Sequence, residues 1–191
     1  MEIFSTFDEQ TKGIYLARFV DCPFYNTPET YETELDKIQE ELQDPQFVRN
    51  FIKSEASGWK KGFYQNVSLS DLAQDVLLET ADLFDKLDEV SEESQSDDCF
   101  DILFDNFKEL SEKEKYDDPG RRKMYTYNKG SILRIYGVLL GNNCLIITGA
   151  GIKLVDKMSE SATLQLELDK MSHLVNWLQE NNITDTTDFE T

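Results

Sequence analysis

Two apolar runs near the C-terminal end constrain the fold of this 191-residue chain more than any other feature. They are SILRIYGVLL, at residues 131–140, and CLIIT, at residues 144–148, and both are rich in β-branched side chains. Such residues favour strands, and the GNN sequence at 141–143 is typical of a tight turn. The sequence therefore predicts a β-hairpin, and the glycines at 149 and 151 permit a bend or bulge before the strand continues.

A second hairpin and several helices complete the expected elements. Residues 2–7 and 13–20 alternate apolar and polar side chains around a polar turn, which predicts an N-terminal hairpin. Apolar residues recur at helical spacing in much of the remaining chain. The helices are expected to start at Thr27, at Asp44, at Ser70, near Phe100 and at Ser161. The predicted fold is α+β: an antiparallel sheet, made of the N-terminal and C-terminal hairpins, flanked by several helices.

Charge is distributed unevenly along the chain. The 38 acidic and 19 basic residues give a formal net charge of −19, which repels free nucleic acid and anionic membranes at long range. Residues 70–118 hold 18 acids and 4 bases, whereas residues 119–157 hold 7 bases and 1 acid. One cationic segment therefore lies inside an acidic protein.

Several functional classes are disfavoured. No apolar run reaches the roughly 18 residues that a membrane-spanning helix needs, and the first residues lack the features of a secretory signal. We therefore expect a cytoplasmic protein that makes no membrane contact. The three cysteines (Cys22, Cys99 and Cys144) are odd in number and far apart, and His173 is the single histidine. Neither a disulfide framework nor a metal site is expected, and no motif indicates a cofactor.

The cationic segment carries the candidate catalytic residues. Arg134 and Tyr136 lie two apart in a predicted strand and so project from one face, and Lys153 follows the returning strand toward the same region. Cationic groups neutralise phosphate, and a tyrosine ring can stack on a base, so this pattern fits an RNA phosphodiester. Because no histidine is at hand, a lysine would have to act as the base toward a ribose 2′-hydroxyl.

Further basic residues of the segment are candidates for RNA binding. They are Arg121, Arg122, Lys123, Lys129 and Lys157. An equally physical alternative is that these cations pair with acids on the chain's own helices or on a partner chain.

From Leu133 to about Val175 the sequence resembles the RelE/ParE superfamily of toxins, nearest to its phage-derived, HigB-like branch. The resemblance rests on the segments LRIYGVLLG, CLIITGAG and IKLVDKM, and on a helix that opens SESATLQLELDKM. In the family the same order runs from a strand with an arginine and a tyrosine, through a lysine pair, to a helix rich in Glu and Leu. The second lysine of that pair is Leu154 here.

The resemblance implies a fold and a function. It implies an acidic hairpin and helical region at 1–118 and a RelE-like hairpin and helix at 119–191, within one compact domain. The family's function is toxicity in a type II toxin–antitoxin pair, commonly through metal-independent cleavage of mRNA on the ribosome. Carried over by position, Arg134 would stabilise the phosphate charge, Lys153 and Lys157 would bind RNA or exchange protons, and Tyr136 would stack or orient.

Two functions remain open on the sequence alone. The first is a toxin or toxin-like endoribonuclease paired with a helix-turn-helix antitoxin. The second is a non-enzymatic acidic interaction protein that binds a basic partner or mimics a nucleic acid. A row of acids on one predicted helix could supply the spacing that mimicry needs: Asp71, Asp75, Glu79, Asp82, Asp85 and Glu89. An acidic face that merely keeps core-packing helices in solution would look the same.

Overall fold

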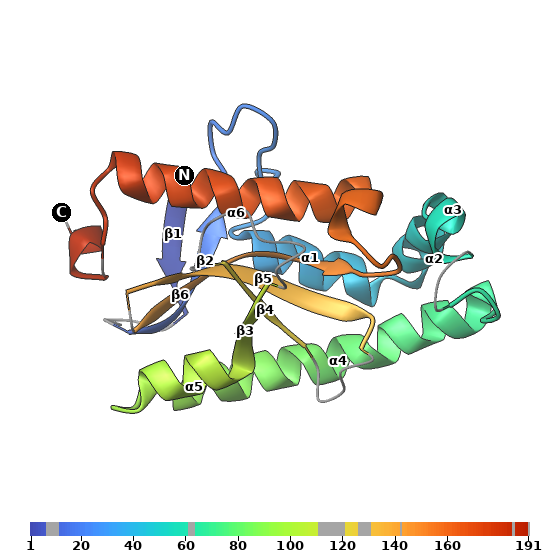
Figure 1. Cartoon of the computed structure of the whole chain (residues 1–191), viewed down its shortest axis with the longest axis horizontal. Helices are drawn as coiled ribbons and strands as arrows, with labels where there is room; N and C mark the ends of the chain where they lie inside the picture. Colours follow the sequence, from blue (N-terminus) through green and yellow to red (C-terminus); the bar gives the residue numbers. More distant parts are fainter. Residues whose placement is uncertain are drawn as a thin grey trace.

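A six-stranded sheet forms the middle layer of the molecule (Figure 1). The structure is a computed structural model that describes residues 1–6, 12–60, 64–110, 121–125, 131–141, 143–184 and 186–190. The strands are β1 (Glu2–Ser5), β2 (Gly13–Arg18), β3 (Phe107–Glu109), β4 (Arg121–Met124), β5 (Leu133–Leu140) and β6 (Cys144–Ile152). The helices are α1 (Glu34–Gln43), α2 (Pro45–Ser54), α3 (Ala56–Trp59), α4 (Leu69–Glu93), α5 (Cys99–Asn106) and α6 (Ala162–Glu180), with short 3-10 turns η1 (Met158–Glu160) and η2 (Thr186–Glu190). The predicted α+β class is confirmed.

The strand order is β1-β2-β6-β5-β4-β3. Both predicted hairpins are present, since β1 pairs with β2 and β5 pairs with β6 in antiparallel fashion. The sheet is mostly antiparallel, and a single parallel pairing, between β2 and β6, joins the two hairpins. A long helical connection between β2 and the later strands makes this arrangement accessible. Strands β3 and β4, which the sequence did not predict, extend the other edge of the sheet.

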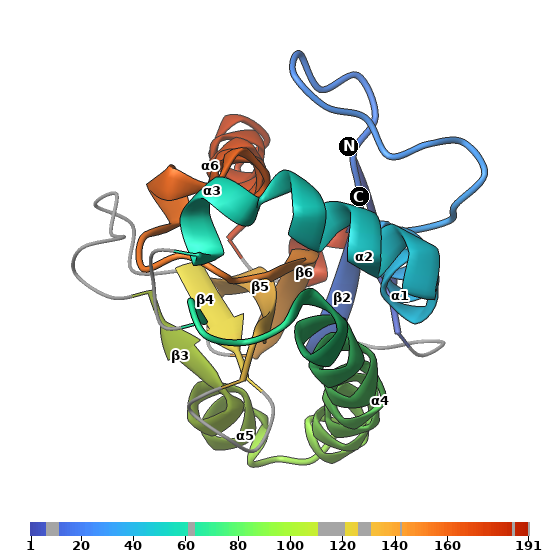
Figure 2. The same ribbon diagram turned by 90° about the vertical axis from the view of Figure 1, so that its right-hand side faces the viewer.

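Helices cover both faces of the sheet. Figure 1 shows α6 on one side of the sheet and α4 and α5 on the other, and Figure 2 shows the same layers from the end. One core cluster lies between the sheet and α1, α2, α4 and α5, and it includes Ile52, Leu83 and Ile135. A second cluster lies between the sheet and α6, and it includes Ile146 and Met171. No helix in the described residues is long and apolar enough to cross a membrane.

The first long helix begins later than its sequence suggests. A start at Thr27 was expected, but α1 begins at Glu34, and Thr33 is its N-cap. The Thr33 hydroxyl accepts a hydrogen bond from the Asp36 N–H, and the Asp36 carboxylate accepts one from the Thr33 N–H, which completes a capping box. The Thr27 hydroxyl is used elsewhere, because it accepts from the Phe19 N–H and donates to Glu34. Thr27 is therefore a buried tertiary contact rather than a cap.

The starts of α2, α4 and α6 follow local capping rules. Asp44 caps α2 with Pro45 in its first turn, and Ser161 caps α6, both as predicted. For α4 the expected cap was Ser70, but the Ser68 hydroxyl accepts from the Asp71 N–H, so the helix starts two residues earlier.

A bulge interrupts the C-terminal hairpin close to the predicted glycine stretch. Tyr136 pairs with Gly149, but the next residue of β5, Gly137, pairs with Ile147, so Thr148 is the extra residue. Glycine is required at position 137, because a Cβ there would lie 2.7 Å from the carbonyl oxygen of Ile146. The bulge lets two strands of unequal length stay paired over the whole hairpin.

Candidate functional site

Strands β4 and β5 bring most of the predicted cationic residues together. Arg134 and Tyr136 share one face of β5, as expected from their spacing, and Lys123 of β4 lies directly opposite Tyr136. The expectation of an open cationic surface is not met at these positions. Arg134 is 9% exposed, Lys123 is 8% exposed and Tyr136 is fully buried.

The Arg134 guanidinium is held by the protein itself. Its Nη1 donates to the carbonyl oxygens of Ser131 and Leu133. The guanidinium carbon lies 4.2 Å from the centre of the Tyr125 ring, a stacking arrangement that favours a cation. Burial lowers the pKa of Arg134, and neighbouring tyrosines and Glu79 oppose that shift. The side chain therefore has a structural role between β4 and β5.

The remaining predicted cations are spread over several elements. Arg122 faces the α5 side of the sheet, where its Nη1 lies 3.4 Å from Glu109. Lys153 is half-buried just beyond β6, and its backbone N–H donates to the Ile132 carbonyl. Lys157 is exposed before η1, and Arg121 is buried in β4. Lys129 lies outside the described residues.

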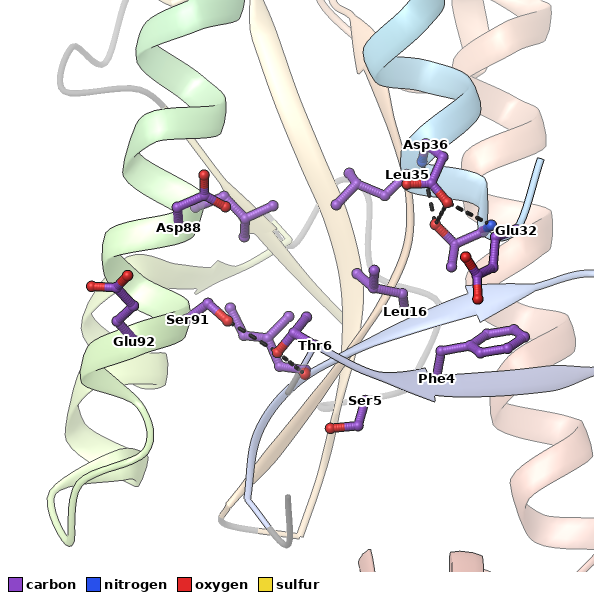
Figure 3. A pocket seen from close by; sticks show the side chains of 13 residues that line it. Phe4, Ser5, Thr6, Leu16, Glu32, Leu35, Asp36, Asp88, Ser91 and Glu92 are labelled. Carbon is purple, nitrogen blue, oxygen red and sulfur yellow. Dashed lines mark hydrogen bonds between the residues drawn. The ribbon is translucent and has the colours of Figure 1, made fainter. Parts of the chain in front are cut away.

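A cavity of about 510 Å³ opens on a different part of the molecule, between α1 and α4 and over β1 and β2 (Figure 3). We call it the acidic groove. It is lined by Phe4, Ser5, Thr6, Ile14, Leu16, Glu32, Thr33, Leu35, Asp36, Leu87, Asp88, Ser91 and Glu92. The Thr6 and Ser91 hydroxyls lie 3.1 Å apart and tie the β1 end to α4. The hairpin therefore closes one side of the groove against the long helix.

Acidic side chains stand on both walls of the groove. Figure 3 shows Asp88 and Glu92 on α4, and Glu32 and Asp36 on the other wall, where the chain enters α1. Within the described residues, none of these four carboxylates has a lysine or arginine within salt-bridge distance. Partial burial raises the pKa of Asp88, and the negative charges of Asp85 and Glu92 raise it further. The Thr33 N–H and hydroxyl partly compensate Asp36, and the groove as a whole is a region of negative potential with no cation from the described residues in it.

Five apolar side chains line the groove together with these acids. Ile14 and Leu87 are buried, and Leu16 and Leu35 are half-buried. An acidic rim over an apolar floor suits a lysine or arginine side chain, because the long methylene stem packs on the floor while the charged end meets the carboxylates. The site can therefore bind cations, and its described residues do not form a group of three or more side chains arranged to hold a metal ion.

Sequence reasoning found only part of this acidic surface. The predicted row on α4 is exposed at Asp71, Asp75, Asp82, Asp85 and Glu89. Glu79 is the exception, because its carboxylate accepts from the Ser131 hydroxyl and from the Ile132 N–H. Asp88 and Glu92, which do line the groove, were missed. Their spacing of four residues on one helix was a usable signal, but nothing local indicated that α1 would face them.

Comparisons with known proteins give no further guide to this site. No protein-family model, no curated protein and no solved structure matches the chain.

Proposed function

We propose that this chain is a non-enzymatic interaction protein that binds a basic segment of another protein in the acidic groove. The observation that carries the proposal is the pair of acidic walls, Glu32 with Asp36 and Asp88 with Glu92, which stand over an apolar floor without a described cation between them. Like charges held together in a folded protein cost free energy, and a cationic ligand would remove that cost.

The charge of the whole chain supports the same assignment. A formal net charge of −19 attracts a basic protein over long distances and repels nucleic acid. The exposed acids of α4 continue the negative surface along the helix away from the groove. A basic helix or tail, such as that of a helix-turn-helix antitoxin, has the charge and the long side chains that this surface would bind.

A direct test uses a short, labelled amphipathic peptide of lysine and leucine, with a glutamate and leucine peptide of equal length as its counterpart. We expect the basic peptide to bind, the acidic peptide not to bind, and the affinity to fall as NaCl is raised. Asp88→Asn combined with Glu92→Gln should weaken binding about ten-fold, which corresponds to about 1.4 kcal/mol. Fluorescence anisotropy measures each of these affinities.

The matched control removes the same charge from the opposite side of the molecule. Asp169→Asn combined with Glu180→Gln changes two exposed acids of α6, and we expect it to leave the peptide affinity within about two-fold of the native value. Equal losses in the two double variants would show that only net charge matters, and the groove would then no longer be the proposed site.

A second candidate function is a toxin-like, metal-independent endoribonuclease that pairs with an antitoxin. The observation that favours it is the gathering of Lys123, Arg134, Tyr125 and Tyr136 across β4 and β5. This function predicts growth inhibition and loss of translation when the chain is expressed alone. Arg134→Ala combined with Lys153→Ala should abolish both effects, and inhibition that survives the double change would refute the nuclease assignment.

A further inference from the structure

Strands β2 and β6 are parallel neighbours, and the helices that follow them lie on opposite faces of the sheet. The helix after β2 is α1, whose Ile38 and Leu42 belong to the core cluster on the α4 side. The helix after β6 is α6, whose Leu164 and Met171 belong to the cluster on the other face. Ligand pockets form at the carboxyl ends of such strand pairs, because the two connections diverge there. The topology therefore favours a binding site at the carboxyl end of β6.

A second, smaller cavity lies at this end of β6. It has a volume of about 100 Å³ and lies between α1, α2 and α6, beside the strand residues Ala150, Gly151 and Ile152. We call it the α1–α6 pocket, and it shares no lining residue with the acidic groove. Much of its wall is apolar, including Phe47 and Phe51 of α2, whose rings stack with their centres 6.4 Å apart.

The charged side chains of the pocket wall balance one another. The wall contains two lysines and two glutamates. Lys37 Nζ lies 3.5 Å from a carboxylate oxygen of Glu41, and Lys170 Nζ lies 2.8 Å from Glu167 Oε1. A charged ligand would lose its water on entering and would find no unmatched charge in the wall to replace it. The pocket is therefore suited to a neutral molecule.

Near its carboxyl end, β6 has a partner strand on one side only. Its parallel pairing with β2 ends at Ile147, whereas its antiparallel pairing with β5 continues to Ile152. In an antiparallel pair, every second residue directs its N–H and C=O groups away from the partner strand. The Lys153 N–H donates to the Ile132 carbonyl, which fixes this alternation. The backbone groups of Ala150 and Ile152 therefore point away from β5, on the side of the pocket.

These backbone groups are the polar feature of the pocket. Ala150 and Ile152 are 8% and 3% exposed, and in the part of the chain that the structure describes no strand pairs with them on this side. Buried N–H and C=O groups need a hydrogen-bond partner, which water or a ligand has to supply here. The N–H and C=O of one extended residue lie side by side, so a carboxamide, which donates and accepts at neighbouring atoms, can pair with both.

We propose that the α1–α6 pocket binds a small neutral molecule that carries a carboxamide or a similar donor–acceptor group. The carboxamide pairs with the backbone N–H and C=O of Ala150, and the apolar remainder packs against Phe47 and Phe51. An apolar cavity of about 150 Å³ holds benzene, so this smaller one suits a molecule of about five non-hydrogen atoms. The inference does not depend on the function proposed for the acidic groove.

The test is a titration with three molecules of this size: propionamide, 2-butanone and propionate. Their shapes are nearly the same, but only propionamide both donates and accepts, and only propionate is charged at about pH 7. We expect propionamide to cause saturable NMR shifts in the residues that line the pocket, and the Ala150 N–H proton to move downfield as it gains an acceptor. The affinity for 2-butanone should be about five-fold lower, because it leaves the C=O unpaired. Propionate should not bind, because its charge would be buried unmatched.

Two variants of α6 locate the binding site. Leu166→Phe adds a ring to the wall of the pocket and should prevent the binding of propionamide. Val175→Phe adds a ring to a half-buried position of the same helix outside the pocket, and it should leave the affinity within about two-fold of the native value.

The titrations of the native protein decide the proposal even if Leu166→Phe does not fold. The absence of saturable propionamide shifts in the pocket, an equal affinity for 2-butanone, or binding of propionate would each overturn it. Unchanged propionamide affinity in folded Leu166→Phe would overturn it as well.

Discussion

Lys170 and Glu34 lie 136 positions apart in the sequence, and their side chains form an ion pair that is almost fully withdrawn from water. Burying two charges costs several kcal/mol of desolvation, so such a pair stabilises the fold only when its remaining donors and acceptors are satisfied. Tyr25 and Thr27 do this for Glu34, and the Tyr25 ring lies 4.4 Å from Lys170 Nζ. Removing Lys170 would leave the buried carboxylates of Glu34 and Glu167 without their nearest cation, so the pair helps to specify where α1 and α6 meet.

The titration of Glu167 gives a pH-dependent prediction at the residue scale. Burial raises the pKa of Glu167 from 4.5 to about 6 in the folded protein. A raised pKa stabilises the fold below the unfolded value, and that stability is lost as the pH rises through about 6. The free energy of unfolding of the native protein, relative to Glu167→Gln, should therefore fall by about 2 kcal/mol between about pH 4 and pH 7. Urea unfolding at each pH measures it, and parallel curves for the two proteins would contradict it.

At the scale of elements, α1, α2, α4 and α6 each begin where a side chain accepts from one of the first free N–H groups. Ser68 and Ser70 both precede acids and apolar residues, so sequence alone did not distinguish them. The structure places Ser68 before the helix, with its hydroxyl 3.1 Å from the Asp71 N–H. Ser70 lies inside the first turn of α4 and is exposed. The two serines therefore make different contributions to the stability of the same helix.

Substituting each serine separately tests this assignment. Ser68→Ala should lower the free energy of unfolding by about 1 kcal/mol, because a helix N–H loses its partner. Ser70→Ala should change the free energy of unfolding by less than about 0.5 kcal/mol, because the substitution only replaces one exposed helical side chain with another. Chemical denaturation of the two variants beside the native protein provides the comparison. A larger loss for Ser70→Ala would mean that α4 starts where the sequence suggested.

At the scale of the whole molecule, the net charge of −19 acts against the compact state. Many acids are exposed on α4 and around the acidic groove, whereas four of the 19 basic residues lie buried in β4 and β5. The surface is therefore more uniformly negative than the composition suggests. The proposed binding surface of one sign would therefore be maintained at the expense of stability.

Because the crowded acids oppose folding but would attract a basic partner, stability and peptide binding should respond to salt in opposite directions. Raising NaCl from about 20 mM to about 300 mM should increase the free energy of unfolding, because salt screens the repulsion, while it weakens the binding of a basic peptide. Asp88→Asn combined with Glu92→Gln should likewise raise the midpoint of urea unfolding at low salt and lower peptide affinity. A fall in stability on adding salt, or in the double variant, would show that these acids are paired rather than crowded.

The sequence by itself determined what depends on neighbouring residues. The alternation at 2–7 and 13–20, the apolar runs at 131–140 and 144–148, and the caps at Asp44 and Ser161 indicated both hairpins and two of the helices. The shared face of Arg134 and Tyr136 also followed from strand spacing. Each of these features is set by backbone geometry over a few residues, and side-chain periodicity records that geometry directly.

Only the tertiary structure decided which faces meet. The parallel pairing of β2 with β6, the burial of Arg134 and the opposition of Asp36 to Asp88 join parts of the chain that no local pattern relates. A charged residue on a strand or helix has the same sequence signature whether it faces solvent, a ligand or the core. Packing settles the choice, because desolvation penalises a charge only once another element has covered it.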